Sequence, residues 1–191
     1  MTAFLIGLVV FLGLHSVSIV APAWRAQQIE RRGERRWKAV YSLLALVSFV
    51  VMVYGYGIAR QNSAVLYVPP TGLRHLALLL MLPVFVLLLA AYLPGRVQRA
   101  TRHPMLLAVK LWALAHLLAN GTLVDVLLFG AFLAWAVADR IAVKRRSVPH
   151  VVPGAPAAAA NDVIAIGAGL AFYVVFLLWG HRWLIGVSPL G

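Results

Sequence analysis

Residues 2–21 read TAFLIGLVVFLGLHSVSIVA and carry no charged side chain. A helix needs about 20 consecutive apolar residues to cross the hydrocarbon core of a bilayer, so this stretch predicts a transmembrane helix. Residues 39–59 form a second uncharged run of the same kind. Because lipid cannot hydrogen-bond an exposed backbone, two such runs predict an all-α membrane protein in which helices pack against one another.

Four further apolar segments complete the predicted bundle. Residues 76–93 and 163–187 predict ordinary crossings, and Asn161-Asp162 predicts the cap that opens the second of them. Residues 105–119 and 123–138 are shorter, and Asn120-Gly121 between them predicts a turn. We therefore expect a short polar helical hairpin over 104–139, because helices of about 16 residues reach only about 24 Å. The prediction is one transmembrane domain over 1–191, a polytopic membrane helix bundle of about six transmembrane helices with a cytoplasmic linker at 140–161.

The composition excludes several classes of protein. Hydrophobic residues make up 63% of the chain and charged residues 12%, which is far from the balance of a soluble globular protein. The net charge of +12 lies in short clusters between apolar runs, a pattern typical of topology signals and anionic-lipid contacts, so no nucleic-acid partner is expected. The absence of cysteine excludes disulfides, thiolate ligands, iron–sulfur clusters and covalently attached haem.

The basic residues also predict an orientation. If the six predicted spans alternate, 13 of the 17 Lys and Arg residues fall on one side, 3 on the other and Lys110 within the membrane. Basic connections favour the cytoplasm, so we expect a multi-pass protein with both termini outside. The three residues expected outside are Arg60, Arg74 and Arg182.

Three ionisable residues within the predicted spans need an explanation: His15, Lys110 and Asp125. Such a group costs at least about 2.5–3.5 kcal/mol on insertion scales, so it is paired, reaches the interface or serves a function. Lys110 lies seven residues after His103 and therefore shares its helix face. Two interpretations of Lys110 are open, an ion pair with Asp125 across the hairpin or an anchor for an anionic group such as a propionate.

Two buried histidines are candidate metal ligands, although each could equally be a hydrogen-bonded residue of the helix core. His15 lies about two thirds of the way through the first span. His116 lies within the hairpin, one helical turn before Asn120 and on the same face. Both positions are too deep for an interfacial histidine.

The motif Arg102-His103-Pro104 predicts a helix start. Proline suits the first helical turn, where its missing N–H removes no hydrogen bond, so His103 is held at the helix start. The positive end of the helix dipole and the nearby arginines suit an anionic ligand.

Four features of the chain occur together: His15-Ser16, the run TRHPMLLAVKLWALAHLLANG at 101–121, Asp125 with Phe129-Gly130, and Gly186-Val187-Ser188-Pro189-Leu190. With these features the chain resembles the NnrU family of bacterial membrane proteins over essentially its whole length. The resemblance implies a location in the bacterial inner membrane and an association with denitrification, namely the production of active nitrite and nitric oxide reductases. It also implies nitric oxide reductase or other denitrification proteins as partners.

The zeta-carotene isomerases, relatives of this family, are similar at the His-Ser and Arg-His-Pro positions and use a non-covalent haem b. This similarity implies that His15 and His103 are axial ligands of a haem, and His116 is the alternative to His103. It also implies a haem-dependent redox or isomerase reaction, with a lipophilic compound as one class of substrate. The candidate cofactor-binding residues are Arg102, Lys110 and Asn120.

Two other hypotheses remain open at this point. The Arg-His-Pro turn before a short hairpin is also similar to membrane methyltransferases of the isoprenylcysteine type, which use S-adenosylmethionine. Their donor site uses acidic and aromatic residues near the C-terminus, where this chain is poor in acids. The third hypothesis is a cofactor-free assembly or scaffold protein in which polar groups only lock helices together.

Overall fold

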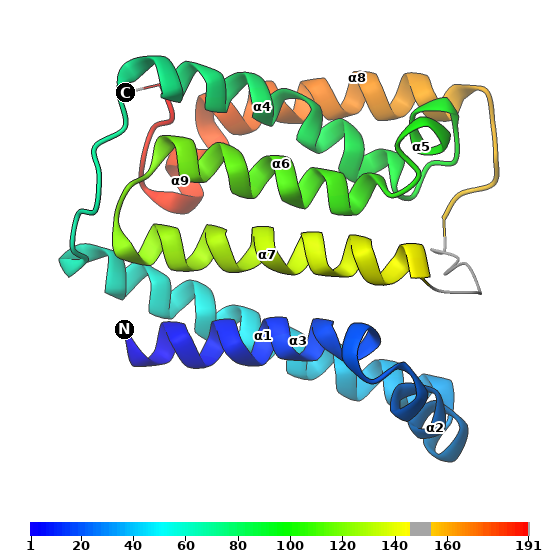
Figure 1. Ribbon diagram of the computed structural model, residues 1–191. Coiled ribbons are helices and arrows are strands. Elements are labelled where there is room, and N and C mark those ends of the chain that lie inside the picture. The colour runs from blue at the N-terminus through cyan, green and yellow to red at the C-terminus, as the bar shows by residue number, and fades with distance from the viewer. Residues whose placement is uncertain (146–153, 191) are drawn as a thin grey trace. The chain divides into compact units, whose positions relative to one another are not determined.

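The computed structural model describes residues 1–145 and 154–190, and the regular elements within them are all helical (Figure 1). Five of these helices are long and apolar enough to cross a membrane, and a shorter apolar helix accompanies them. The prediction of an all-α polytopic membrane helix bundle is therefore confirmed. The five candidate spans are Thr2–Val20, Glu34–Asn62, Thr71–Ala90, Leu123–Arg145 and Ala160–Ile185.

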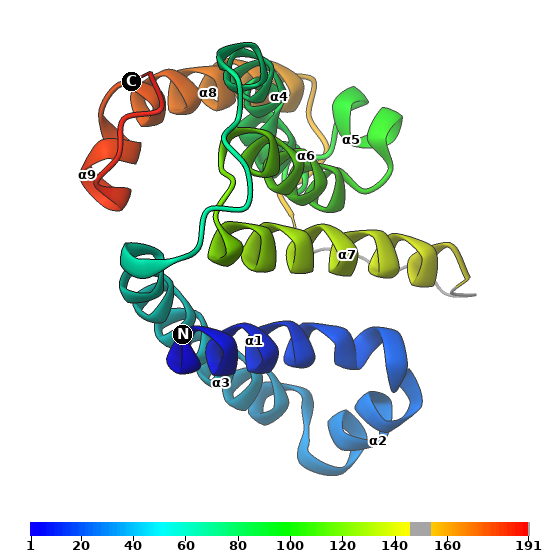
Figure 2. The same cartoon turned by 60° about the vertical axis from the view of Figure 1, so that its left-hand side comes forward.

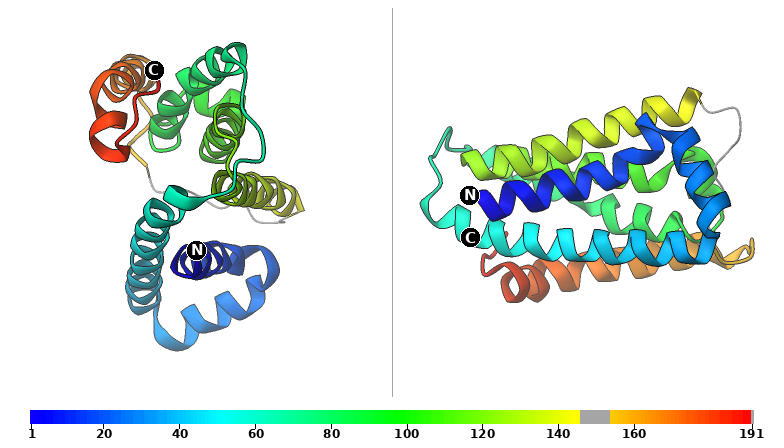
Figure 3. Two further views of the ribbon diagram at one scale, coloured as in Figure 1. Left: turned by 90° about the vertical axis from the view of Figure 1, so that its left-hand side faces the viewer. Right: turned by 90° about the horizontal axis from the view of Figure 1, so that it is seen from below.

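The chain forms two compact units, and the first comprises Met1–Tyr67 and Gly121–Arg145. Helix α1 packs along α3 and also contacts α7 (Figure 2; Figure 3). Where α1 meets α3, a Cβ on Gly55 would lie 2.7 Å from Phe4 Cα, and one on Gly7 would lie 2.6 Å from Met52 Cα. Glycine therefore permits the close approach of these two backbones. The helices of this unit are α1 (Thr2–Val20), α2 (Pro22–Arg32), α3 (Glu34–Ala59), the 3₁₀ turn η1 (Arg60–Asn62) and α7 (Leu123–Arg145).

The second unit comprises Val68–Asn120 and the described part of Arg146–Gly191. Helix α4 contacts both α6 and α8, and buried Val84, Leu87 and Ala108 form the centre of an apolar cluster. Pro83 interrupts the backbone hydrogen bonds of α4, and the Tyr173 hydroxyl of α8 donates to the nearby Leu78 carbonyl at 2.9 Å. Its elements are α4 (Thr71–Ala90), α5 (Arg96–Thr101), α6 (Pro104–Ala119), α8 (Ala160–Val175), the π-helical turn η2 (Phe176–Gly180) and α9 (His181–Ile185).

The boundaries of α6 and α7 differ from the predicted hairpin in one respect. Helix α6 has 16 residues, as its short apolar run indicated, and the chain turns at Asn120–Thr122. Helix α7, however, has 23 residues and runs to Arg145, past the end predicted at residue 138. The polar residues after 138 contain no proline or glycine before Pro149, so they continue the helix rather than end it.

The Asn161-Asp162 pair caps a different helix from the one predicted. Asp162 accepts hydrogen bonds from the backbone N–H groups of Arg96 and Val97, at 2.8 and 3.0 Å, and so caps α5. Asn161 is buried and donates to the carbonyls of Pro94 and Pro156. The prediction that this pair caps its own span was wrong, because Asp162 bonds the first turn of α5, and Asn161 bonds the segments that precede α5 and α8.

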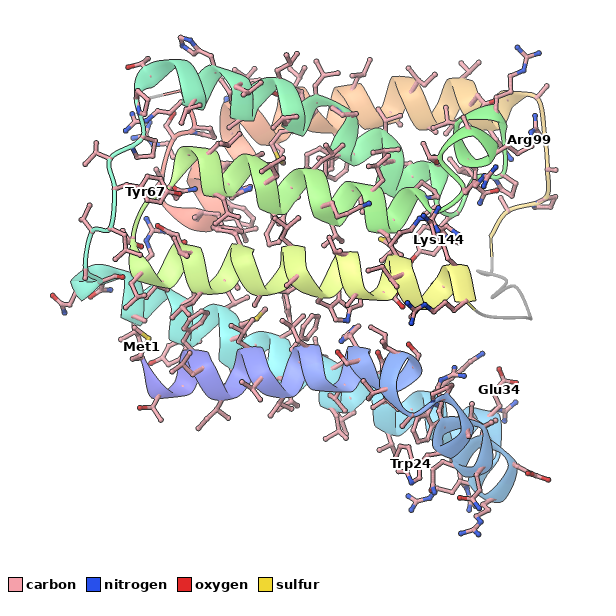
Figure 4. All side chains as sticks on the ribbon, in the orientation of Figure 1. Met1, Trp24, Glu34, Tyr67, Arg99 and Lys144 are labelled. Atoms are coloured by element: carbon pink, nitrogen blue, oxygen red, sulfur yellow. The ribbon has the colours of Figure 1, made fainter. Side chains whose placement is uncertain are left out.

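Helix α2 was not predicted as a separate element. Pro22 occupies its first turn, and Gly33, with a φ of 80°, separates it from α3. Trp24 of α2 packs edge-on against Trp37 of α3, with ring centroids 5.7 Å apart. Figure 4 labels Trp24 and Glu34 at this end of the unit. The arginines on either side of Gly33 in the sequence are exposed.

We expect Gly55→Ala to destabilise the protein by about 1–3 kcal/mol, because its methyl group would meet the backbone of α1. Gly57→Ala is the matched control, since a Cβ there has no atom within 4 Å and alanine favours a helix. Thermal unfolding in detergent, followed by tryptophan fluorescence, measures both. Equal unfolding midpoints for the two variants would contradict the close contact of α1 with α3.

Candidate functional site

His15 lies on α1 with one ring nitrogen fixed by its own helix. Its Nδ1 is 2.7 Å from the Phe11 carbonyl oxygen. A carbonyl only accepts hydrogen bonds, so Nδ1 of the neutral ring carries the proton and Nε2 presents a lone pair. Among the described residues, this Nε2 has no hydrogen-bond partner. The neighbouring Ser16 donates to the Leu12 carbonyl at 2.7 Å and is satisfied within the helix.

Aromatic rings from all three long helices of the first unit surround His15. The Phe11 ring lies 4.2 Å away between centroids, the Tyr41 ring of α3 lies 5.6 Å away, and the Trp135 ring of α7 lies 6.0 Å away at 89°. The Trp135 Nε1 atom is buried and has no hydrogen-bond partner among the described residues. A buried unpaired donor costs about 1–3 kcal/mol, so this indole is the least satisfied polar group near His15.

The Arg102-His103-Pro104 motif forms a strained turn in the second unit. Arg102 has φ 60° and ψ −40°, and it is the one non-glycine residue of positive φ in the described ranges. The His103 N–H donates to the Thr101 carbonyl at 2.7 Å, which closes a γ-turn around Arg102. This conformation costs of order 1–3 kcal/mol, which the surrounding structure must hold in place. Asp162 supports it by capping α5 immediately before the turn.

His103 then takes the N-cap position of α6, and Pro104 occupies the first turn as the sequence predicted. The His103 carbonyl accepts the Leu107 N–H at 3.1 Å. Arg102 is exposed, as is Arg99 of α5, which Figure 4 labels. The motif therefore presents positive charge beside the start of a 16-residue helix.

The other predicted site residues in this region, Lys110, His116 and Asn120, lie along α6 and at its C-terminal end. His116 Nδ1 lies 2.8 Å from the Trp112 carbonyl oxygen, and their rings are 5.3 Å apart. Asn120 ends the helix by donating from its side chain to the His116 carbonyl at 3.0 Å. Lys110 is partly buried and has no hydrogen-bond or ion-pair partner within the described part of the second unit. The predicted anionic contact of Lys110 stays a prediction.

Asp125 is buried and fully bonded within the first unit. The Tyr56 hydroxyl donates to Oδ1 at 2.6 Å, and the Thr122 hydroxyl and backbone N–H donate to Oδ2 at 2.6 and 3.2 Å. Thr122 and Asp125 are spaced as a capping box, which starts α7. This Thr-x-x-Asp pattern was visible in the sequence, whereas the distant partner Tyr56 was not. Partial burial and the nearby Asp125 carboxylate raise the pKa of the Tyr67 phenol.

The structure groups the predicted residues by unit. His15 and Asp125 belong to the first unit, and His103, Lys110, His116 and Asn120 belong to the second. Within residues 1–145 and 154–190, no three His, Cys, Asp or Glu side chains are grouped to hold a metal ion. The predicted axial pair requires only two histidines, so its assignment stays a prediction.

A double-mutant cycle tests the Tyr56–Asp125 hydrogen bond. We expect Tyr56→Phe to lower the free energy of unfolding by about 1–3 kcal/mol in the wild-type protein. In a protein that already carries Asp125→Ala, the same substitution should have a much smaller effect, because the hydrogen-bond acceptor is absent. Tyr54→Phe is the control, since Tyr54 is 68% exposed. Chemical unfolding in detergent micelles measures each variant. Additive effects at positions 56 and 125 would contradict a direct bond.

The comparison with known protein families matches nearly the whole chain. Residues 3–189 match the family model described as NnrU protein. No curated protein and no solved structure matches the chain. The match includes the helix that carries His15, the Arg-His-Pro turn and all of α6 and α7. This multi-pass membrane protein therefore belongs to the NnrU family.

Proposed function

We propose that this NnrU-family protein binds a non-covalent haem b, with His15 as one axial ligand and His103 or His116 as the other. The observation that carries the proposal is the arrangement of His15. Its Nδ1 is hydrogen-bonded to the Phe11 carbonyl, and the aromatic rings of Phe11, Tyr41 and Trp135 pack against its imidazole. A histidine ligand ordinarily donates one ring N–H to a carbonyl or carboxylate and ligates through the other nitrogen.

The chemistry of the available residues fits such a group. Aromatic walls suit the apolar faces of a porphyrin, and His116 has the same Nδ1 arrangement as His15. Arg102 and Lys110 are cations that suit propionate groups, and Asn120 lies near the end of the His116 helix. When bound, haem iron supplies one-electron redox chemistry or a site for small ligands. The protein's own contribution is to orient the histidines and to exclude water from them.

We further propose that the protein acts in denitrification, in the production or activity of nitrite and nitric oxide reductases. Family membership supports this proposal, with nitric oxide reductase or another denitrification protein as partner. A haem-dependent redox or isomerase reaction on a lipophilic substrate is the alternative use of the same site. The two alternative hypotheses are a methyltransferase that uses S-adenosylmethionine and a cofactor-free scaffold. Either would be favoured if the protein bound no haem.

We expect protein purified in detergent from cells supplied with haem to show a Soret band. His15→Ala should abolish the band because it removes an axial ligand, and His75→Ala should retain it because His75 is exposed on α4. Separate His103→Ala and His116→Ala variants identify the second ligand. A colourless wild-type protein would refute the haem proposal, and binding of S-adenosylmethionine would then favour a methyltransferase.

The proposed location is the bacterial inner membrane with both termini outside. Because the chain has no cysteine, single substitutions can report which side each loop faces. We expect Ala64→Cys, in the loop after η1, to react with a membrane-impermeant maleimide in intact spheroplasts. Gln27→Cys, on the basic helix α2, should react only after lysis. Both residues are exposed, so the reverse pattern would mean the opposite orientation.

A further inference from the structure

Two side chains that pack against His15, and a third beside them, are hydrogen-bond donors for which the described residues provide no hydrogen-bonded or ion-paired partner. They are the buried indole N–H of Trp135, the partly buried hydroxyl of Tyr41 and the partly buried guanidinium of Arg25. The three come from α7, α3 and α2, which are separate helices of the first unit.

Ring distances connect two of these donors to His15, and charge connects the third, Arg25, to Tyr41. The rings of Tyr41 and Trp135 both lie within 6.0 Å of the His15 ring. Arg25 is within electrostatic range of the Tyr41 hydroxyl and also of Glu34. Glu34, however, forms its own ion pair with Lys38 at 2.8 Å, which leaves Arg25 without a bonded carboxylate.

The chemistry of the three groups specifies what would satisfy them. All three donate, and an arginine guanidinium only donates, so the missing partner is an acceptor. A carboxylate is the acceptor that an arginine binds most strongly, and it can take several hydrogen bonds at once. A surface that only packs against lipid gains nothing from this arrangement, because hydrocarbon offers no acceptor.

We propose that Arg25, Tyr41 and Trp135 bind a carboxylate of the molecule that His15 holds. The inference rests on the proposed function, in which that molecule is haem b and the carboxylate is one of its propionates. All three donors belong to the first unit, as His15 does. His15 then supplies the ligand nitrogen, and the three donors recognise the charged edge of the same molecule.

The test compares haem b with its dimethyl ester, which keeps the iron and the ring but lacks free carboxylates. Absorbance titration of the full-length protein in detergent gives the dissociation constant for each. We expect Trp135→Phe and Tyr41→Phe to weaken haem binding about 3- to 10-fold, and Arg25→Gln about 10-fold or more. The same variants should change binding of the ester by less than about twofold, and Arg25→Lys should restore part of the loss.

Exposed residues of the same kinds provide the matched controls. Trp24→Phe and Arg31→Gln, both on α2, should leave both dissociation constants unchanged. The haem-free Trp135→Phe protein should unfold at the wild-type temperature or above it, because the substitution removes an unpaired buried donor. A variant that merely damages packing would lose stability without haem and would weaken both ligands equally.

The outcomes separate the two proposals. Wild-type protein that binds haem through His15, with the three variants unaffected, overturns the carboxylate inference alone. Variants that weaken the binding of haem and of its ester equally also overturn it, because the donors would then not distinguish a free carboxylate from an ester. Wild-type protein that binds neither compound overturns the proposed function and the inference together.

Discussion

Lipid neither donates nor accepts hydrogen bonds, and this constraint divides the polar side chains of the bundle into two groups. In the first group the protein supplies every partner: Asp125 is bonded by Tyr56 and Thr122, and Tyr173 donates to a carbonyl of α4. The bonds of Tyr56 and Tyr173 join separate helices and fix the positions of those helices, whereas the Thr122 bond caps the start of α7. In the second group, Trp135 has no hydrogen-bond partner within the described ranges.

The same constraint explains how the helices approach one another. Hydrocarbon drives no hydrophobic association between helices, so close contact of backbones and shared hydrogen bonds must stabilise their packing. Gly55 allows α3 to meet α1, and Gly169 allows α8 to meet α4 at Val86, whereas Gly57 and Gly167 have open space around them. Gly167 and Gly169 lie two residues apart on the last span, and only the fold shows that Gly169 carries a helix contact while Gly167 does not.

Sequence patterns predicted the spans well because hydropathy is a local property. The positions of α1, α3 and α6 follow their apolar runs, and Pro104 begins α6 as expected. What the sequence could not predict depends on partners far along the chain. Asp162 caps α5 across 66 residues, and Tyr56 bonds Asp125 across 69. The γ-turn at Arg102 was also missed, since a positive φ is rare for arginine and no local residue signals it.

The histidines of the candidate site also cannot be assigned from local sequence alone. His15 and His116 each bond the carbonyl four residues earlier in their own helix, so this local arrangement cannot by itself distinguish a ligand from a core residue. His15 differs in its environment, because the rings of Tyr41 and Trp135 pack against it and neither side chain has a hydrogen-bond partner among the described residues. A buried donor without a hydrogen-bond partner costs free energy, and a bound molecule that accepts its hydrogen bond would offset that cost. The proposed ligand site therefore rests on His15 together with the unbonded donors beside it.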